Sequence, residues 1–405
     1  MRGEHACVVC MEATLVHELL LLPGPVAVAP DVLQAAALPM QNHRGPRMRA
    51  LLARITERCQ EILQTKERVF ILGSSGTGAL EAAIVNLFSP GDLLLSLSVG
   101  AFGDRIAAIA RTYGAQVESL AEEWGCGNDP ARLARRLAED TRGAVKGILV
   151  THNETSTGVA NDLAAIARAR ADHPALLVVD SVSGAGAEDL RMDEWCLDAV
   201  ATASQKALAA PPGCAVLALS RRAWDSVGNA KMPRFYLDLT KAQRAADEGS
   251  TPWTPPVPIL TALERATDNY LREGRQAAFS RHARFAAAVR SGCIALGLSL
   301  FARPAWYSST VTAVCVPQGI EAKALLAKLR ERFGVVLGGG QQKLDGKVFR
   351  IGNMGAIGER DLLGAIGALE LTLDDMGYRA ALGQGVAATA RALEPASSAT
   401  LRAAG

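Results

Sequence analysis

The chain has 405 residues, which predicts two to three domains at roughly 150 residues each. Hydrophobic residues make up 49% and charged residues 21%, proportions that exclude a disordered chain. The net charge of +2 argues against a nucleic-acid-binding protein, and no run approaches the roughly 18 uncharged apolar residues that a membrane span needs.

The first part of the chain predicts a cytoplasmic protein. The short apolar stretch Leu19–Leu22 follows His17 and Glu18, so it lacks the long apolar core of a signal peptide. Eight scattered cysteines in a chain of this size favour free thiols over a disulfide framework. Cys7 and Cys10 form a lone CxxC with no second pair, and we interpret it as incidental, so no metal site is expected.

Short apolar runs alternate with helix patterns from residue 68 to residue 219. Continuous apolar strands separated by helices predict an α/β domain, with a mostly parallel sheet buried on both faces. The predicted strands are 68–72, 93–97, 116–120, 144–150, 175–179, 199–203 and 214–219. The predicted helices between them are 79–88, 103–113 and 163–171.

A rigid proline-rich connector, 251–258, marks a change in pattern. A long helix from 259 through 273 and on to 290 follows it, and then strand 310–316, helix 322–333 and strand 348–351. These elements predict a second, smaller α/β unit. We therefore expect an N-terminal extension (1–20), a large domain (21–265), a small C-terminal domain (266–385) and a flexible tail (386–405).

Polar and glycine-rich segments follow the predicted strands, at the edge where open parallel sheets bind ligands. They are Gly76-Thr77-Gly78, Phe102, 151–158, Asp180-Ser181-Val182 and Ser204-Gln205-Lys206. Each has a simpler explanation: the glycine turn and Asp180 as caps, Lys206 and Arg350 as solvent-facing residues. The glycines form neither a P-loop nor a GxGxxG dinucleotide fingerprint.

Taken together, these residue types fit pyridoxal phosphate. That cofactor needs a lysine for a Schiff base, an acid beside its pyridine nitrogen, a phosphate cradle and a side chain packed on its ring. Lys206 and Asp180 match the first two needs, and a guanidinium such as that of Arg350 binds a substrate carboxylate through two parallel hydrogen bonds.

The sequence resembles the class V aminotransferases of pyridoxal phosphate fold type I, near the alanine–glyoxylate and serine–pyruvate (serine–glyoxylate) branch. The matching segments lie between about residues 21 and 355, in the expected order. They include LLPGPVAVAPDVL (21–33), GSSGTGALEAAIVNLFSPGD (73–92), GAFGDRIAAIARTYG (100–114), THNETSTGV (151–159), VVDSVSGAG (178–186), SQKALAAPPG (204–213), STPWTPPVPIL (250–260) and KVFRIGNMG (347–355).

The resemblance implies a role for each matching position. Lys206 would form the Schiff base and Asp180 would face the pyridine nitrogen. Val182 and Phe102 would pack on the two ring faces, Thr155 would contact the ring hydroxyl side, and Gly24 and Arg350 would bind substrate. The phosphate would lie among Ser75, Gly76, Thr77 and Gln205, with Thr254 of a second subunit, so the resemblance implies a homodimer with composite active sites.

Two positions depart from the family pattern. Thr77 stands where some relatives have His, so its phosphate contact would be shorter and neutral. Thr251 stands where some relatives have Tyr, which puts a second phosphate contact between subunits in doubt.

The expected activity is ping-pong transfer of an amino group from alanine or serine to glyoxylate or pyruvate. Aspartate, ureidoglycine, aminoethylphosphonate and pyridoxamine remain alternative donors. A lyase or cysteine desulfurase is disfavoured because Gln205 precedes the lysine, and a non-catalytic protein because Lys206, Asp180 and Arg350 are all present. The missing GxGxxG disfavours a nicotinamide oxidoreductase.

Overall fold

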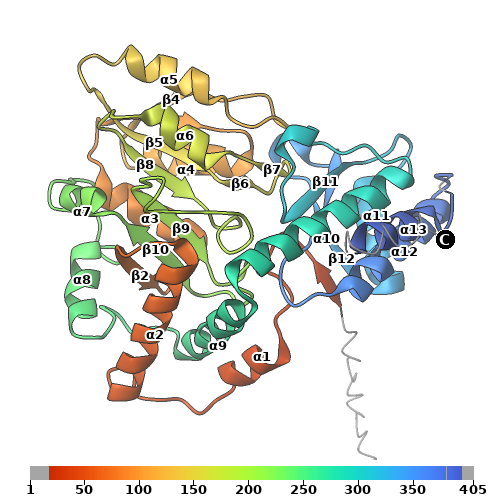
Figure 1. Ribbon diagram of the computed structural model, residues 1–405, viewed down its shortest axis with the longest axis horizontal. Coiled ribbons are helices and arrows are strands. Elements are labelled where there is room, and N and C mark those ends of the chain that lie inside the picture. The colour runs from red at the N-terminus through yellow and green to blue at the C-terminus, as the bar shows by residue number, and fades with distance from the viewer. Residues whose placement is uncertain (1–17, 380, 395–405) are drawn as a thin grey trace, which may run out of the picture.

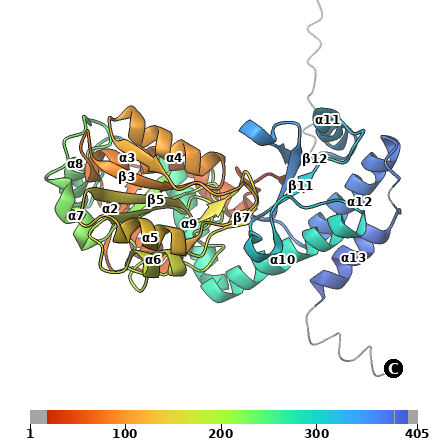
Figure 2. The same cartoon turned by 90° about the horizontal axis from the view of Figure 1, so that it is seen from above.

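The computed structural model describes residues 18–379 and 381–394. Figures 1 and 2 show a larger α/β domain beside a smaller one, with helix α10 (Arg275–Ala295) running along the smaller domain. No helix in the described ranges is long and apolar enough to cross a membrane. Cys7, Cys10 and most of the predicted N-terminal extension lie outside the described residues.

The large domain is built on a seven-stranded sheet. In spatial order its strands are β2 (Arg68–Leu72), β10 (Ala215–Leu219), β9 (Ala199–Ala203), β8 (Leu176–Asp180), β5 (Val145–Thr151), β3 (Leu93–Leu97) and β4 (Gln116–Ser119). Only β10 runs antiparallel to its neighbours among these strands. Strands β8, β9 and β10 are buried throughout, as expected for strands covered on both faces, and the predicted α/β class is confirmed.

Helices cover both faces of this sheet, as Figure 2 shows with α3 and α4 on one side and α5 and α6 on the other. Successive strand residues alternate between the two layers, so that Leu149 packs on one side and Val150 on the other. One apolar layer includes residues of α2 (Pro46–Leu63), α5 (Pro130–Ala138), α6 (Leu163–Arg170) and α9 (Val257–Glu273). The other includes residues of α3 (Gly76–Leu87), α4 (Ala101–Thr112), α7 (Arg221–Val227) and α8 (Leu239–Asp247).

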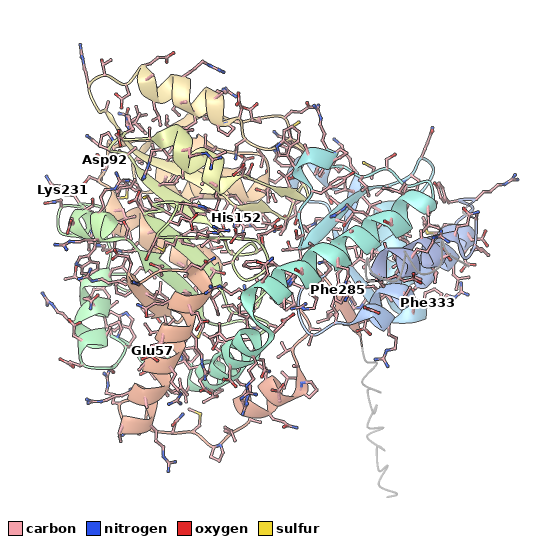
Figure 3. The ribbon with its side chains drawn as sticks, viewed as in Figure 1. Glu57, Asp92, His152, Lys231, Phe285 and Phe333 are labelled. Atoms are coloured by element: carbon pink, nitrogen blue, oxygen red, sulfur yellow. The ribbon has the colours of Figure 1, made fainter. Side chains whose placement is uncertain are left out.

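The small domain has its own four-stranded sheet, in the order β1 (Leu19–Leu21), β12 (Val335–Gly339), β13 (Val348–Gly352) and β11 (Val311–Cys315). Its helices are α10, α11 (Ala322–Phe333), α12 (Glu359–Asp375) and α13 (Gln384–Leu393), and two 3-10 turns are η1 (Pro304–Trp306) and η2 (Gln342–Leu344). Phe285 of α10 is buried in this domain's core, and Phe333 of α11 packs against that core (Figure 3).

The domain limits differ from the sequence-based ones in three places. Residues 19–21 form β1 of the small domain's sheet, because they pair with β12. Residues 266–273 complete α9, which packs on α1 (Pro30–Ala36) and α2 of the large domain, and the predicted long helix breaks at Gly274 (φ +86°). Helix α13 takes in residues 386–393 of the predicted flexible tail and packs on α10 and α12, while residues 395–405 of that tail lie outside the described residues.

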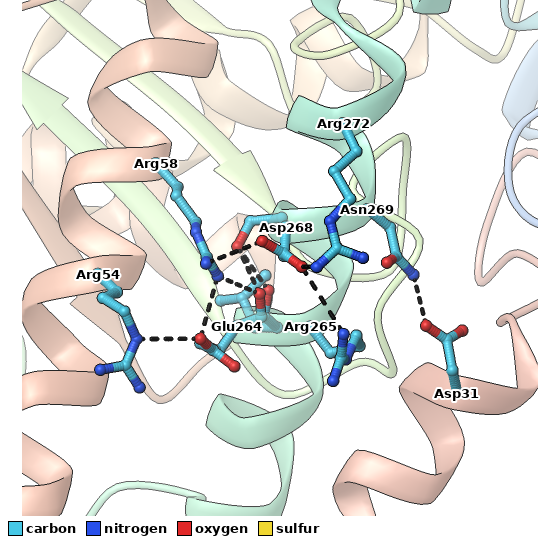
Figure 4. Close-up of polar contacts among 10 residues, drawn as sticks. Asp31, Arg54, Arg58, Glu264, Arg265, Asp268, Asn269 and Arg272 are labelled. Atoms are coloured by element: carbon cyan, nitrogen blue, oxygen red, sulfur yellow. Dashed lines mark hydrogen bonds and ion pairs between the residues drawn. The ribbon is translucent and has the colours of Figure 1, made fainter.

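A network of ion pairs joins α9 to α2 (Figure 4). Asp268 accepts from Arg58 at 3.0 Å and from Arg272 at 2.6 Å, while Glu264 pairs with Arg54 and Arg58 at 3.0 and 3.1 Å. Beside it, Asn269 donates to Asp31 of α1 at 2.8 Å. Most of these side chains are partly exposed, so each pair contributes little to stability.

Asp198, directly before β9, is a buried carboxylate at the amino edge of the sheet. It is 2% exposed and accepts hydrogen bonds from Arg170 and from the Leu177 N–H, both at 2.7 Å, and from Ser220 at 3.0 Å. Arg222 also pairs with it. Asp198 thereby ties α6, β8 and α7 together.

We expect Asp198→Asn to lower the free energy of unfolding by about 3–5 kcal/mol, because it leaves the buried Arg170 guanidinium without its partner. The matched variant Asp268→Asn removes a half-buried carboxylate and should cost about 1 kcal/mol. Urea unfolding of both proteins measures the difference. Equal losses would contradict this account.

Candidate active site

A cavity of 290 Å³ opens at the carboxyl edge of the seven-stranded sheet. Its walls come mainly from the segments that follow β2, β3, β5, β8 and β9, where ligands bind in open parallel sheets. Its size is near the lower end of the roughly 300–1,000 Å³ usual for small-molecule pockets. All of the predicted site residues except Thr254 and Arg350 line this cavity.

Lys206 follows β9 and extends into the cavity beside Gly24. Its Nζ donates to the Pro23 carbonyl, and the φ of Gly24 is +112°, a backbone conformation that favours glycine. Burial lowers the pKa of Lys206 to about 8; the charges of Arg350 and Arg105 add to the lowering, and that of Asp180 opposes it. The amine is therefore partly neutral near physiological pH.

Asp180 is the last residue of β8 and is 4% exposed. Its Oδ1 accepts from the Val182 N–H at 3.0 Å. Burial raises the pKa of Asp180 to about 6, against the opposing effects of that hydrogen bond and of Lys206 and Arg105. The neighbouring His152 (Figure 3) contacts Ser181 at 2.9 Å, and burial lowers the pKa of His152 to about 4, so it stays neutral.

The N-terminus of α3 forms one end of the cavity. Ser75 stands at the N-cap position without a side-chain cap, so the N–H groups of Gly76 and Thr77 precede the first intrahelical bonds. A Cβ at Gly76 would lie 2.6 Å from Cγ2 of Val182, so glycine permits this close approach. The Oε1 of Gln205 is buried without a partner in the described part of the chain. The free backbone N–H groups of this helix end suit an anion.

Glu154 holds the first turn of α4, which carries Phe102. One of its oxygens accepts from the N–H groups of Phe102 and Gly103, both at 3.0 Å, and the other from the Ser156 N–H at 3.1 Å. Burial raises the pKa of Glu154 to about 7, against these hydrogen bonds. Glu154 thus positions the Phe102 ring without lining the cavity itself.

Arg350 reaches the same site from β13 of the small domain. It is 7% exposed, and its guanidinium donates to the Gly339 carbonyl at 2.8 Å and to the Thr155 carbonyl at 3.1 Å. Burial lowers the pKa of Arg350 to about 10, and Glu154 opposes this shift, so the side chain remains charged at neutral pH. Arg350 therefore brings a fixed positive charge from one domain to the cavity of the other.

Comparison with known proteins decides the family. The family model described as aminotransferase class-V matches residues 32–348. The chain belongs to the class V aminotransferases. Its family, its fold and its enzyme class agree with the sequence-based expectation, which is thereby confirmed.

Three similar proteins illustrate the range of this class V aminotransferase family. The chain is 38% identical to a serine–glyoxylate aminotransferase of Hyphomicrobium methylovorum, over 92% of this chain and 93% of that protein. It is 39% identical to a protein of Anabaena cylindrica named soluble hydrogenase 42 kDa subunit, over 92% of this chain and 98% of that protein. The crystal structure of ureidoglycine–glyoxylate aminotransferase from Bacillus subtilis superposes with a TM-score of 0.88 at 30% identity. The match covers 93% of this chain and 98% of that one.

Class V aminotransferases depend on pyridoxal phosphate, and the cavity of this chain fits that cofactor. It offers an amine at Lys206, a carboxylate at Asp180 and, for the phosphate, the N-terminus of α3 with its free backbone N–H groups. Among the described residues, no group of three or more His, Cys, Asp or Glu side chains is arranged to hold a metal ion.

Thr254 lies away from this class V active-site cavity. It is exposed and lines a separate cleft with Gly73, Tyr236 and Trp253. Within one subunit, the structure does not bring Thr254 to the phosphate end of the cavity.

Sequence reasoning assigned no role to several residues at this site, among them Arg105, Gln341 and Glu154. Arg105 and Gln341 line the cavity, and the Gln341 Oε1 lies 3.5 Å from Arg350 Nη1. The spacing of Phe102 and Arg105, three apart on one helix, was an available signal for Arg105. Gln341 and Glu154 depend on contacts made across the chain, and no local pattern marks them.

Proposed function

We propose that this class V aminotransferase moves the amino group of alanine or serine to glyoxylate or pyruvate in a ping-pong reaction. The observation that carries the proposal is that the Lys206 amine and the Asp180 carboxylate line one cavity, while the Arg350 guanidinium donates to the carbonyl of Thr155 in its wall. The names of the serine–glyoxylate and ureidoglycine–glyoxylate relatives support glyoxylate as the acceptor.

Lys206 would bind the cofactor and move protons. Pyridoxal phosphate, when bound, supplies an electron sink for the pair released at the substrate's Cα. As a free amine, Lys206 Nζ would accept the Cα proton and return it during the second half-reaction. Because burial lowers the pKa of Lys206 to about 8, this base is available near neutral pH.

Asp180 would keep the pyridine nitrogen protonated, because a neighbouring negative charge favours the cation. The pKa of Asp180, which burial raises to about 6, leaves the carboxyl ionised at pH 7 and above. Val182 and Phe102 would pack on the two faces of the ring, and Thr155 would lie on its hydroxyl side. Ser75, Gly76, Thr77 and Gln205 would hold the phosphate at the N-terminus of α3.

Arg350 would bind the substrate α-carboxylate, and Gly24 would line that end of the site. Two backbone carbonyls hold the Arg350 guanidinium in place, and its Nη2 has no hydrogen-bond partner in the ranges that the structure describes. A pre-positioned guanidinium of this kind accepts a carboxylate through two parallel hydrogen bonds.

We expect Arg350→Lys to raise the KM for the amino donor by roughly 10- to 100-fold, because lysine cannot make two parallel hydrogen bonds. Steady-state kinetics with L-serine and glyoxylate measure this. Arg360→Lys, an exposed arginine of α12, is the control and should leave KM unchanged. An unchanged KM in Arg350→Lys would place the carboxylate elsewhere.

We further propose a homodimer in which Thr254 reaches the phosphate of the partner subunit. An exposed aromatic cluster next to Thr254 supports a protein surface here: Phe235 is 70% exposed and Tyr236 52%. Both rings stack on Trp253, at 5.3 and 5.7 Å between centroids. We also propose a cytoplasmic location, in keeping with the free cysteines of the described residues.

An absorbance experiment tests the function. We expect the purified protein loaded with pyridoxal phosphate to show a visible band that L-alanine or L-serine removes and glyoxylate or pyruvate restores. A band that survives every amino donor would contradict transamination of small amino acids. A protein that takes up no pyridoxal phosphate would contradict the assigned site.

A further inference from the structure

Arg105 is a charged residue of the cavity that the proposed function leaves without a role. It lies on α4, one turn after Phe102, and its guanidinium carbon is 4.6 Å from the Phe102 ring centroid. It lines the cavity together with Lys206 and Asp180. Its positive charge lowers the pKa of both of those groups, which places the guanidinium within electrostatic range of them.

Within the described residues, no carboxylate lies within 4.0 Å of the Arg105 guanidinium, although carboxylates are nearby. Asp104 accepts from the Ser98 hydroxyl at 2.7 Å, and Asp180 Oδ1 accepts from the Val182 N–H at 3.0 Å. Glu154 is engaged by the backbone N–H groups of α4. The recorded partner of Arg105 is an aromatic ring, which leaves its N–H donors available to a ligand.

The cavity has one more cationic side chain than the proposed function uses. Three cationic side chains act there, Lys206, Arg105 and Arg350, while Asp180 is the carboxylate that lines it. Under the proposed function, Lys206 is taken by the cofactor and Arg350 by the substrate α-carboxylate. The phosphate has its own donors at the N-terminus of α3. Arg105 then has no assigned anion.

We propose that Arg105 is a second anion-binding residue of this cavity, which takes an oxyanion of the bound ligands through its guanidinium. This inference rests on the proposed function and extends its substrate class. The oxyanion has two sources with the same chemistry: the side-chain carboxylate of a dicarboxylic amino donor such as aspartate, or the phosphate of the cofactor. With a carboxylate in that position, the enzyme accepts dicarboxylic as well as small neutral donors.

The experiment compares Arg105→Gln and Arg105→Lys with Arg111→Gln, an exposed arginine further along the same helix. The first measurement is the Kd of the loaded enzyme for succinate and for propionate, which are unreactive acids with two carboxylates and one. The second is the Kd of the stripped protein for pyridoxal phosphate and for pyridoxal. Kinetics with L-aspartate and L-serine complete the set.

Two results support the proposal. If the anion is a substrate carboxylate, Arg105→Gln weakens succinate binding and lowers kcat/KM for L-aspartate, each by roughly 10- to 100-fold. The Kd values for propionate and pyridoxal phosphate and the kcat/KM for L-serine then stay unchanged. If the anion is the phosphate, the variant weakens the binding of pyridoxal phosphate by a similar factor and leaves the binding of pyridoxal unchanged. In either case Arg105→Lys recovers part of the loss and Arg111→Gln matches the parent.

Two results overturn it. Unchanged binding of all four ligands would mean that Arg105 binds no anion here. Parallel losses for succinate and propionate, or for pyridoxal phosphate and pyridoxal, would mean that Arg105 only packs on Phe102. The binding measurements need no turnover, so a failure of the proposed transamination would appear separately, as a parent protein inactive with every donor.

Discussion

The Lys206→Ala protein is expected to bind pyridoxal phosphate without a covalent bond and to lose transamination by roughly 10³-fold or more. The substitution removes the amine that attaches the cofactor, and the same amine is the base that would move the Cα proton. The loaded variant should lack the visible band of the lysine-bound cofactor. Single-turnover absorbance with L-serine measures the remaining rate.

Two controls separate chemistry from folding in this variant. Lys146→Ala removes an exposed lysine whose amine donates to the Gly143 carbonyl, and it should behave as the parent. An added small amine such as methylamine should restore part of the lost proton transfer in Lys206→Ala, because it fills the space of the missing side chain. Full activity in Lys206→Ala without any amine would remove Lys206 from the mechanism.

The elements of the large domain were largely predictable because each has a local cause. A parallel strand covered on both faces must be apolar along its length, and β9 occupies 199–203 as predicted. The predicted 175–179 becomes β8 at Leu176–Asp180, one residue later, because the ladder continues until Asp180 pairs with Ala201. Asp180 thus becomes the last residue of a buried strand.

The domain boundaries were less predictable because they depend on packing between distant segments. Leu19–Leu21 joins the small domain by pairing with β12, more than 300 residues later in the chain. The apolar stretch of these leucines is compatible with many environments. Similarly, Tyr270 belongs to the large domain because its side chain lies in that domain's core, which the helical pattern around it does not indicate.

The site was predictable where its residues follow strands and unpredictable where they act across the fold. The carboxyl edge of the sheet gathers Gly76, Asp180 and Lys206, since each stands at or directly after a strand or turn that the pattern marks. Glu154 caps a helix that begins about fifty residues earlier in the chain. Gln341 contacts the site only because the small domain lies against the large one.

Asp180→Asn should lose most turnover and at the same time stabilise the protein that lacks its cofactor. Asparagine cannot hold the pyridine nitrogen protonated, so kcat should fall by roughly 10²-fold or more. In the stripped protein, no cationic side chain of the described residues is bonded to this buried carboxylate, and burial raises the pKa of Asp180 to about 6 from its ordinary 3.8. Keeping this group ionised therefore costs folding free energy.

The sign of the pH dependence follows from that shift. Between the two pKa values of Asp180, 3.8 unfolded and about 6 folded, the folded protein holds the proton more tightly, so its stability falls as pH rises through this window. At pH 7.5 the Asp180→Asn protein should therefore be more stable by roughly 1–3 kcal/mol, and at pH 4 the two should be nearly equal. Urea unfolding of the stripped proteins at the two pH values measures this, with the exposed Asp345→Asn as control.

A stability loss at pH 7.5 would mean that Asp180 already has a charge partner in the empty site. The expected gain in the free energy of unfolding would instead show that the buried Asp180 carboxylate destabilises the empty protein. The chain then keeps this unfavourable group for the sake of the cofactor that pairs with it.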